Sequence, residues 1–234
     1  MDLLELEDSF TDIGGQFLRS AFDLREQLPN IKAYLFDWDG VFNDGSKLGS
    51  EGSRFSEVDS AGLRMLRYGH FKKYGSIPYL GVITGAANPV ARDLMQNHQA
   101  NVLYQRAIRK GKALEHFMEH YELKAEEICY VFDDVLDLAV AREVGLRFCV
   151  GRLANPLFLG LVAGSDLADY ITASQGDEHA VREVSELLLG LMDNYTEVVQ
   201  EFISEQNHYT QFKEAAAQIE MQTWEFKSGN FERL

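Results

Sequence analysis

The chain has 234 residues, a net charge of −15 and 46% hydrophobic residues. This length suits one globular domain with additions, and the apolar content excludes a disordered chain. The negative charge argues against a nucleic-acid or anionic-membrane surface, because nothing would offset the repulsion of the phosphates. We therefore expect no nucleic acid and no membrane as a partner. A small anionic substrate is still allowed, since one metal ion can reverse the local charge.

The N-terminus is acidic and lacks a basic region ahead of an apolar core, so no signal peptide is expected. No stretch approaches the roughly 18 uninterrupted apolar residues of a membrane span. The two cysteines, Cys129 and Cys149, fall in apolar strand-like segments and are expected to be buried free thiols. These features together predict a cytoplasmic protein.

Residues 3–28 carry a helical pattern that the pair Gly14-Gly15 weakens or bends. A buried strand follows at about 32–37. Residues 43–58 are rich in Gly, Ser and charge, and we expect a short hairpin or flap there, with arms at 47–48 and 54–56. Beyond this flap, short apolar strands alternate with helices, which is the signature of a doubly wound parallel sheet.

The strands are expected at 78–84, 101–104, 128–132, 147–150 and 170–172. The helices are expected from 59 to about 71, from Asn88-Pro89 onward, at 110–121, at about 135–143 and from 178 to about 205. The predicted fold is therefore α/β, a doubly wound parallel sheet with a short β-hairpin flap and extra N- and C-terminal helices. Its predicted parts are an N-terminal helical extension at 1–30, a core at 31–190 and a C-terminal helical extension at 191–234.

Three of the predicted strands end in polar side chains. Asp37 and Asp39 follow the first strand, Thr84 follows the second, and Asp133 and Asp134 follow the fourth. Because the carboxyl ends of parallel strands lie along one edge of a sheet, these side chains can converge. So many carboxylates would repel one another unless a hard cation such as Mg²⁺ lay among them.

Lys110 begins a helix between the third and fourth strands and can reach the same edge. Together with Thr84 it would hold an anion, and a phosphoryl group between Mg²⁺ and a lysine is the natural occupant. Asp37 can attack phosphorus and form an aspartyl-phosphate. Asp39 can protonate the leaving oxygen and later activate water.

Four motifs occur in this order along the chain: Asp37-Trp-Asp39-Gly40, Ile83-Thr84-Gly85, Lys110-Gly-Lys-Ala, and Asp133-Asp134 followed by Asp137. In these motifs the chain resembles the haloacid dehalogenase (HAD) superfamily of phosphatases, whose core is Rossmann-like. Within it, the chain is most similar to the capless 3-deoxy-D-manno-octulosonate 8-phosphate phosphatase subfamily. The resemblance covers about residues 31–190 and also rests on residues 39–45, 59–63, 103–105 and 180–184.

The resemblance implies a Mg²⁺-dependent hydrolase of a small phosphorylated metabolite, a sugar or sugar-acid phosphate. It also implies a homo-oligomer, a homotetramer in that family, in which the flap packs between subunits. The implied metal ligands are Asp37, the backbone carbonyl of Asp39, and Asp133, with Asp134 and Asp137 in support. The implied phosphate-binding residues are Thr84, Gly85 and Lys110, with Lys112 as the alternative lysine.

The chain departs from the family pattern at two positions near the predicted site. Phe132 stands where the family has a glycine, which changes the packing beside the metal. Glu178 stands where the family has an arginine that would meet a sugar-acid carboxylate. Two alternatives follow: a phosphatase for a non-sugar metabolite, and a non-catalytic module for oligomerisation or regulation. The retained Asp39 argues against the second, because a purely structural domain needs no acid for a leaving group.

Two further features are interpreted as structural. His116, Glu119 and His120 match a zinc-protease pattern, but they fall opposite the apolar stripe of their helix and are expected to face solvent. Trp38 is expected to pack in or beside the core.

Overall fold

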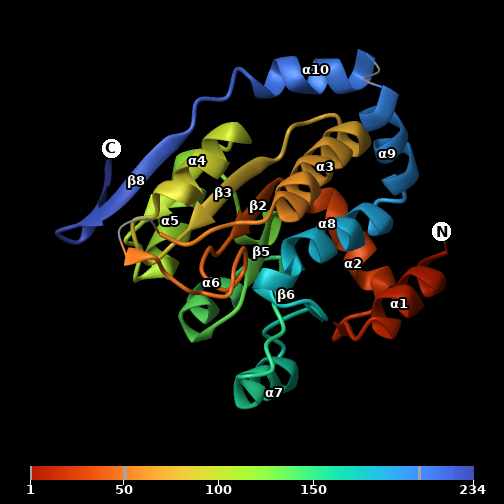
Figure 1. The fold of residues 1–234 in the computed structure, drawn as a ribbon, viewed down its shortest axis with the longest axis horizontal. Helices are drawn as coiled ribbons and strands as arrows, with labels where there is room; N and C mark the ends of the chain where they lie inside the picture. The colour runs from red at the N-terminus through yellow and green to blue at the C-terminus, as the bar shows by residue number, and fades with distance from the viewer. Residues whose placement is uncertain (1, 50–51, 205–206) are drawn as a thin grey trace.

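The computed structural model describes residues 2–49, 52–204 and 207–234, and these form one nine-stranded sheet with helices on both faces (Figure 1). The strands are β1 Gln16–Phe17, β2 Ala33–Phe36, β3 Tyr79–Ile83, β4 Val102–Gln105, β5 Ile128–Phe132, β6 Leu146–Cys149, β7 Tyr170–Ile171, β8 Gln222–Lys227 and β9 Asn230–Arg233. The α-helices are α1 Leu3–Asp12, α2 Ala21–Gln27, α3 Glu57–Tyr74, α4 Pro89–Asn97, α5 Lys110–Tyr121, α6 Leu138–Ala141, α7 Pro156–Gly164, α8 Ala180–Leu191, α9 Tyr195–Ser204 and α10 Asn207–Ala216.

The strand order is β1-β7-β6-β5-β2-β3-β4-β8-β9. The seven strands from β7 to β8 in this order pair in parallel, and only β1 and β9 at the two edges are antiparallel. The predicted doubly wound parallel sheet is thus confirmed. In the described part of the chain, no helix is long and apolar enough to cross a membrane.

Two hydrophobic cores lie on the two faces of the sheet. Along β2, the side chains of Tyr34 and Phe36 enter one core, while those of Ala33 and Leu35 enter the other. The first core is covered by helices that include α3, α4 and α8, and the second by α5, α6 and α7. Because both faces of the central strands are buried, their sequences are continuous apolar runs.

The winding of the sheet reverses between β2 and β5. From β2 the chain adds β3 and β4 on one side, and it then returns to place β5, β6 and β7 on the other. Ligands of open α/β sheets bind at the carboxyl ends of the strands beside such a reversal. Asp37 follows β2 and Asp133 follows β5, so the fold places both residues there.

The N-terminal segment is not one helix but two, separated by a short strand. Gly14, with φ of +108°, turns the chain after α1 so that β1 can pair with β7. A Cβ on Gly15 would lie 1.8 Å from the hydroxyl oxygen of Tyr170, so only glycine permits this close approach. The glycine pair therefore ends the helix instead of bending it.

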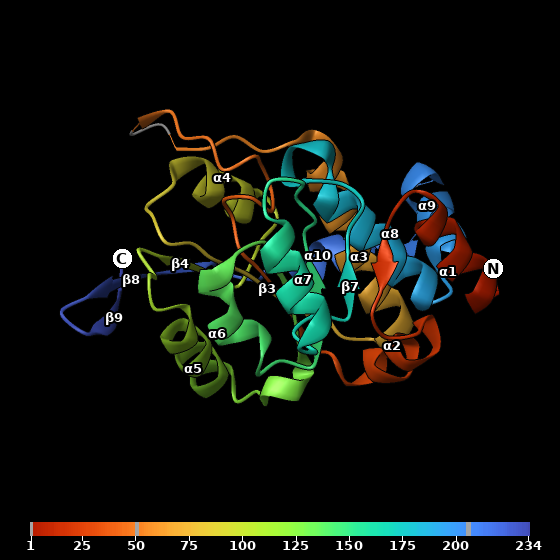
Figure 2. The same ribbon diagram turned by 90° about the horizontal axis from the view of Figure 1, so that it is seen from below.

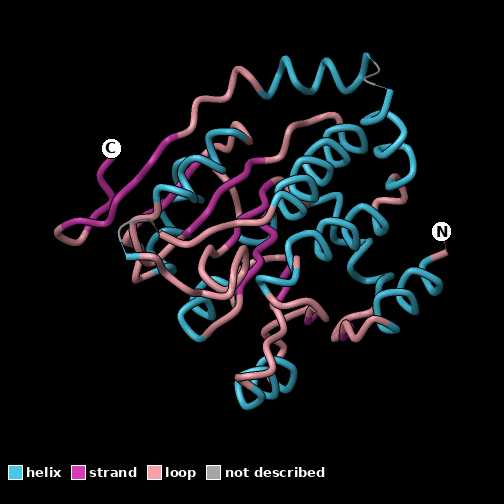
Figure 3. Tube along the Cα trace, viewed as in Figure 1, coloured by secondary structure: helices cyan, strands magenta, loops and turns pink. Residues whose placement is uncertain are grey.

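The C-terminal segment 191–234 contains strands as well as the predicted helices. The expected long helix from 178 to 205 is divided into the 3₁₀ turn Gly176–Glu178, α8 and α9, with Asp193 at φ +56° in the break between the last two. Figure 3 shows the chain running from α10 through a loop into β8. Because β8 pairs with β4, the segment reaches the edge of the sheet opposite β1, and the two termini lie on opposite sides of the molecule (Figure 2).

The predicted flap contains no strand in its described residues, 43–49 and 52–58; residues 50 and 51 lie outside the described part. One backbone hydrogen bond joins its arms, from the N–H of Leu48 to the carbonyl of Gly52 (2.9 Å). The segment is thus a loop instead of a β-hairpin. Helix α7 was not expected from the sequence, and it stands out from the body of the fold in Figure 1.

Candidate active site

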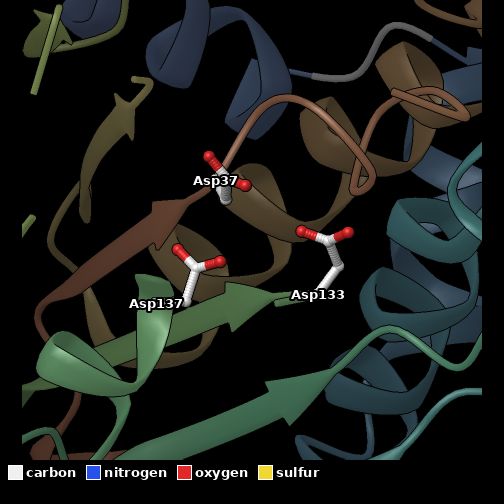
Figure 4. A group of neighbouring side chains, drawn as sticks. All are labelled: Asp37, Asp133 and Asp137. Carbon is white, nitrogen blue, oxygen red and sulfur yellow. The ribbon is translucent and has the colours of Figure 1, made fainter. Parts of the chain in front are cut away.

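Three buried carboxylates face one another at the reversal of the sheet (Figure 4). They are Asp37 after β2, Asp133 after β5 and Asp137 at the end of the 3₁₀ turn Val135–Asp137. One oxygen atom from each lies within 4.8 Å of the others. Asp37, Asp133 and Asp137 are called the carboxylate trio below.

Lys110 lies inside this site, and its positive charge contacts two members of the trio. It is the first residue of α5, and its Nζ lies 2.6 Å from Oδ1 of Asp37 and 2.6 Å from Oδ1 of Asp137. Burial alone would lower the pKa of Lys110, but the two carboxylates outweigh it and raise that pKa above its ordinary value. Lys112 is exposed and pairs with Glu115 at 2.5 Å, so Lys110 is the lysine that contacts Asp37.

Asp137 is held from three directions. Its Oδ1 accepts hydrogen bonds from Lys110 and from the buried hydroxyl of Tyr130, and its Oδ2 accepts the backbone N–H of Asp134 at 3.3 Å. The side chain of Asp134 is turned away, because its Oδ1 caps the short turn by accepting the N–H of Val135 at 2.7 Å. Asp137 is therefore a member of the trio, whereas Asp134 contributes a backbone donor and a cap.

The trio holds more negative charge than the adjacent cations offset. Burial raises the pKa of Asp37 above its ordinary value, and Asp137 raises it further in spite of Lys110. Burial, followed by the effect of Asp137, raises the pKa of Asp133 to about 7. Carboxylate oxygens are the ligands that Mg²⁺ prefers, and a divalent cation would remove this repulsion. The donor set therefore fits a hard divalent cation.

The side chain of Asp39 points to a different set of partners. Its Oδ2 lies 3.0 Å from Nζ of Lys47, and its Oδ1 accepts a hydrogen bond from the hydroxyl of Ser53 at 2.5 Å. The Ser53 hydroxyl in turn accepts the indole N–H of Trp38 (3.0 Å) and the side-chain N–H of Asn88 (2.9 Å). Asp39 is therefore held by the loop 43–58. Its role as general acid and base and the contribution of its backbone carbonyl to a metal site both remain predictions.

Arg152 is a site residue that the sequence analysis missed. It lies in the loop after β6, and its Nη2 is 2.6 Å from Oδ2 of Asp133. Since it follows a parallel strand at the same edge, the reasoning that identified Asp133 could have found it. Lys47 and Ser53 were also missed as partners of Asp39, because an irregular loop carries no periodic signal.

Thr84 follows β3, beside β2, and is fully buried. Its Oγ1 accepts the N–H of Ala86 at 3.4 Å, and Gly85 is exposed. In the part of the chain that the structure describes, neither Thr84 nor Gly85 forms a hydrogen bond or ion pair with the trio. Their role as phosphate-binding residues remains a prediction.

Three other expectations can be compared with the structure. Phe132 is buried in the second core and stacks on Tyr130, so its ring faces the core. Trp38 is fully buried and stacks on Phe42, as expected for a packing residue. The expectation that His116 faces solvent was wrong. It is half-buried against Trp224 and Phe231 of the C-terminal strands, which the sequence analysis did not predict.

No family model matches the chain. It is 30% identical over 171 residues to the 3-deoxy-D-manno-octulosonate 8-phosphate phosphatase KdsC of Escherichia coli strain B, covering 71% of this chain and 84% of that protein. A crystal structure of 3-deoxy-D-manno-octulosonate 8-phosphate phosphatase from Moraxella catarrhalis, in complex with a magnesium ion, a phosphate ion and a KDO molecule, is 27% identical with a TM-score of 0.63. That similarity covers 77% of this chain and 98% of the other. The structure of a putative HAD superfamily (subfamily III A) hydrolase from Legionella pneumophila is 26% identical with a TM-score of 0.64, covering 78% and 95%.

The sheet topology, the carboxylate trio and these similarities define a phosphatase of the haloacid dehalogenase superfamily. Within that superfamily, the chain belongs to the 3-deoxy-D-manno-octulosonate 8-phosphate phosphatase family, the KdsC type.

Proposed function

We propose that this chain is a Mg²⁺-dependent hydrolase of a sugar-acid phosphate of the 3-deoxy-octulosonate 8-phosphate kind, acting through an aspartyl-phosphate on Asp37. The observation that carries the proposal is the buried trio with Lys110 at the reversal of the sheet. The substrate class comes from the relatives, which are phosphatases of that sugar acid.

In this proposal Asp37, Asp133 and the backbone carbonyl of Asp39 would hold the metal, and Asp137 lies close enough to join them. When bound, Mg²⁺ supplies positive charge that stabilises the phosphoryl oxygens. Lys110 offers a second positive charge on the Asp137 side of Asp37. Thr84 and Gly85 complete the predicted phosphate-binding residues.

A carboxylate oxygen of Asp37 forms a bond to phosphorus, while the bond from phosphorus to the sugar oxygen breaks. Asp39 gives its proton to that oxygen, so the sugar leaves as an alcohol. Asp39, now a carboxylate, takes a proton from water as the water oxygen attacks phosphorus, which releases inorganic phosphate and restores Asp37. The hydrogen bond from Ser53 and the ion pair with Lys47 would hold the Asp39 carboxylate in place for the proton transfer from water.

The test is phosphate release from a panel of substrates: 3-deoxy-D-manno-octulosonate 8-phosphate, neutral sugar phosphates and para-nitrophenyl phosphate, with Mg²⁺ and with a chelator. Asp37→Asn should lower kcat by at least about a thousandfold. The matched control is Asp8→Asn on the exposed side of α1, which should leave kcat unchanged. Absence of turnover on the whole panel would overturn the proposed enzymatic activity and favour a non-catalytic module. Turnover that survives both Asp37→Asn and the chelator would overturn a Mg²⁺-dependent reaction through Asp37.

We further propose that the chain forms a homo-oligomer through the carboxyl edge of its sheet, with a tetramer as the expected state. The support is a set of apolar side chains on loops and helices after β4, β5 and β6. Leu153 is 91% exposed and Leu157 is 89% exposed, and Ile108, Val135 and Leu136 are also exposed. Exposed apolar side chains in such numbers are typical of an interaction surface. Light scattering should give a multimer that Leu157→Asp dissociates, and a monomeric wild type would refute this assembly.

The proposed compartment is the cytoplasm. Cys129 and Cys149 are both buried and unpaired, which suits a reducing environment.

A further inference from the structure

Arg152 reaches the site through a close approach that depends on Gly40. The backbone of Gly40 has φ of +94°, and a Cβ built on it would lie 2.4 Å from Nη2 of Arg152 and 2.0 Å from Oδ2 of Asp133. The guanidinium group therefore packs against the α-carbon of the residue that follows Asp39. This contact places its charge beside the backbone of the loop that follows Asp39.

The cations at the site differ in the number of carboxylates that each one contacts and in how far each one is buried. Lys110 is buried and lies between two carboxylates, and Lys47 pairs with Asp39. Arg152 has one ion-pair partner in the described part of the chain, Asp133, which contacts only Nη2. A guanidinium group carries five N–H donors, and the Arg152 side chain is 28% exposed. Arg152 and the more exposed Lys47 both keep donors for a ligand, and of these two Arg152 is the one that contacts the carboxylate trio.

The position of Arg152 selects the part of the substrate that it can meet. Lys110 contacts Asp37 and Asp137, so it lies on the phosphoryl side of the nucleophile. Arg152 contacts the third member of the trio, Asp133, and lies against Gly40, the residue that follows Asp39 in the chain. A group bound there belongs to the leaving sugar and not to the transferred phosphoryl group.

Glu178 cannot bind an anion beside Arg152, because its own side chain is a carboxylate. It is exposed, and its Oε2 accepts hydrogen bonds from the backbone and side-chain N–H groups of Gln175. The loop that holds it is nevertheless close, because a Cβ on Gly176 would lie 2.4 Å from the carbonyl oxygen of Gly40. An anionic group on the leaving sugar therefore needs another cation at this side of the site.

We propose that Arg152 binds the carboxylate of the leaving sugar acid and so sets the preference of this enzyme for sugar-acid phosphates over neutral sugar phosphates. Bidentate pairing of guanidinium with carboxylate is geometrically specific and strong. The inference rests on the proposed function, since it assigns the substrate specificity of that same site.

The test compares Arg152→Gln, Arg152→Lys and the wild type on two substrates, 3-deoxy-D-manno-octulosonate 8-phosphate and mannose 6-phosphate. For the sugar acid, Arg152→Gln should raise KM at least about tenfold with little change in kcat, and Arg152→Lys should recover part of the loss. For the neutral sugar phosphate, KM should change less than about twofold, as should the Mg²⁺ concentration that gives half-maximal rate. The control is Arg142→Gln, an exposed arginine that pairs with Glu143.

Equal losses on both substrates, or a raised Mg²⁺ requirement, would overturn the proposal, because Arg152 would then act only through Asp133. Calorimetry on Asp37→Asn protein, with and without Arg152→Gln, separates this inference from the proposed function. Sugar-acid phosphate that binds at least about tenfold more weakly without Arg152 supports the inference even if no variant turns over. Equal binding to both proteins refutes it whether or not the wild type is a phosphatase.

Discussion

Ser53 is the hydrogen-bonding centre that joins Asp39, the proposed general acid, to the rest of the fold, and Ser53→Ala tests this role. Its hydroxyl donates to Asp39 and accepts from Trp38 and from Asn88. Trp38, Asn88 and Ser53 are all buried, with exposed fractions of 0%, 3% and 1%. Alanine at this position would remove the acceptor of two buried donors at once.

The expected loss in the free energy of unfolding of Ser53→Ala follows from these contacts. A buried donor left without a partner costs about 1–3 kcal/mol. The cap of α4 survives the change, because the N–H groups of Val90 and Ala91 donate to Oδ1 of Asn88 and not to Ser53. Two unpaired donors therefore predict a loss of about 2–5 kcal/mol in the free energy of unfolding. Asp39 keeps Lys47 but loses its second fixed donor, so kcat should also fall, by about tenfold.

Urea denaturation followed by tryptophan fluorescence measures the first effect, and phosphate release under conditions where each variant is fully folded measures the second. Ser46→Ala is the matched control, because Ser46 is exposed and its hydroxyl donates to Asp44 on the surface (2.9 Å). The control should cost less than about 0.5 kcal/mol. A similarly small loss for Ser53→Ala would show that the network does not hold Trp38 and Asp39 as described.

Two further predictions concern single ionisable groups. Lys110→Ala should lower kcat at saturating Mg²⁺ by at least about a hundredfold, because it removes the cation between two buried carboxylates. The kcat of Lys112→Ala should stay within about twofold of the wild-type value. Comparable losses for the two variants in steady-state kinetics would contradict the choice of Lys110 as the lysine of the site. Burial raises the pKa of Asp59 to about 6 in the folded protein, so the folded state binds its proton more tightly than the unfolded state. The free energy of unfolding should therefore fall by about 2–3 kcal/mol as pH rises from about 4 to 6 and then level off. Urea titrations across this range should show a fall that is larger by this amount in the wild type than in Asp59→Asn, which keeps the contributions of Asp37 and Asp133, and parallel profiles would refute the buried state of Asp59.

The central strands could be predicted because each is apolar along its whole length and ends at a polar residue. Strand β5 and helix α5 lie within the expected bounds, since burial on both faces and a clear amphipathic stripe leave little ambiguity. The C-terminal hairpin was missed although its signals are local. Trp224 and Phe226 alternate with polar residues, and Ser228 and Gly229 both have positive φ, as a two-residue hairpin turn requires. The alternation covers too few residues to distinguish a strand from an irregular segment, and the pairing of β8 with β4, which stabilises the strand, cannot be seen in the sequence.

The candidate site could be predicted as far as it depends on strand order. Asp37 and Asp133 are far apart in sequence, and the expectation that they converge rested only on parallel strands that end at one edge. The partners of Asp39 could not be found in this way. Lys47 and Ser53 belong to a loop without periodicity, and their contacts depend on how that loop folds back over Trp38. Arg152 was within reach of the same strand-end reasoning, because it follows β6 after Val150 and Gly151, but it was missed.

The site divides into groups fixed by strands and groups carried by loops, and this division separates chemistry from specificity. Asp37 and Asp133 are buried at the ends of the neighbouring parallel strands β2 and β5, and Lys110 is buried at the start of α5, so a change in any of them should disturb both the core and the reaction. Arg152 is partly exposed and comes from a loop that carries no strand pairing. A substitution of Arg152 should change which leaving groups bind without moving Asp37, whereas Lys47 is paired with Asp39 and belongs with the proposed chemistry. Glu178, where the family resemblance leads us to expect an arginine, and Arg152 both lie outside the carboxylate trio, and substrate preference is the property on which we expect them to act.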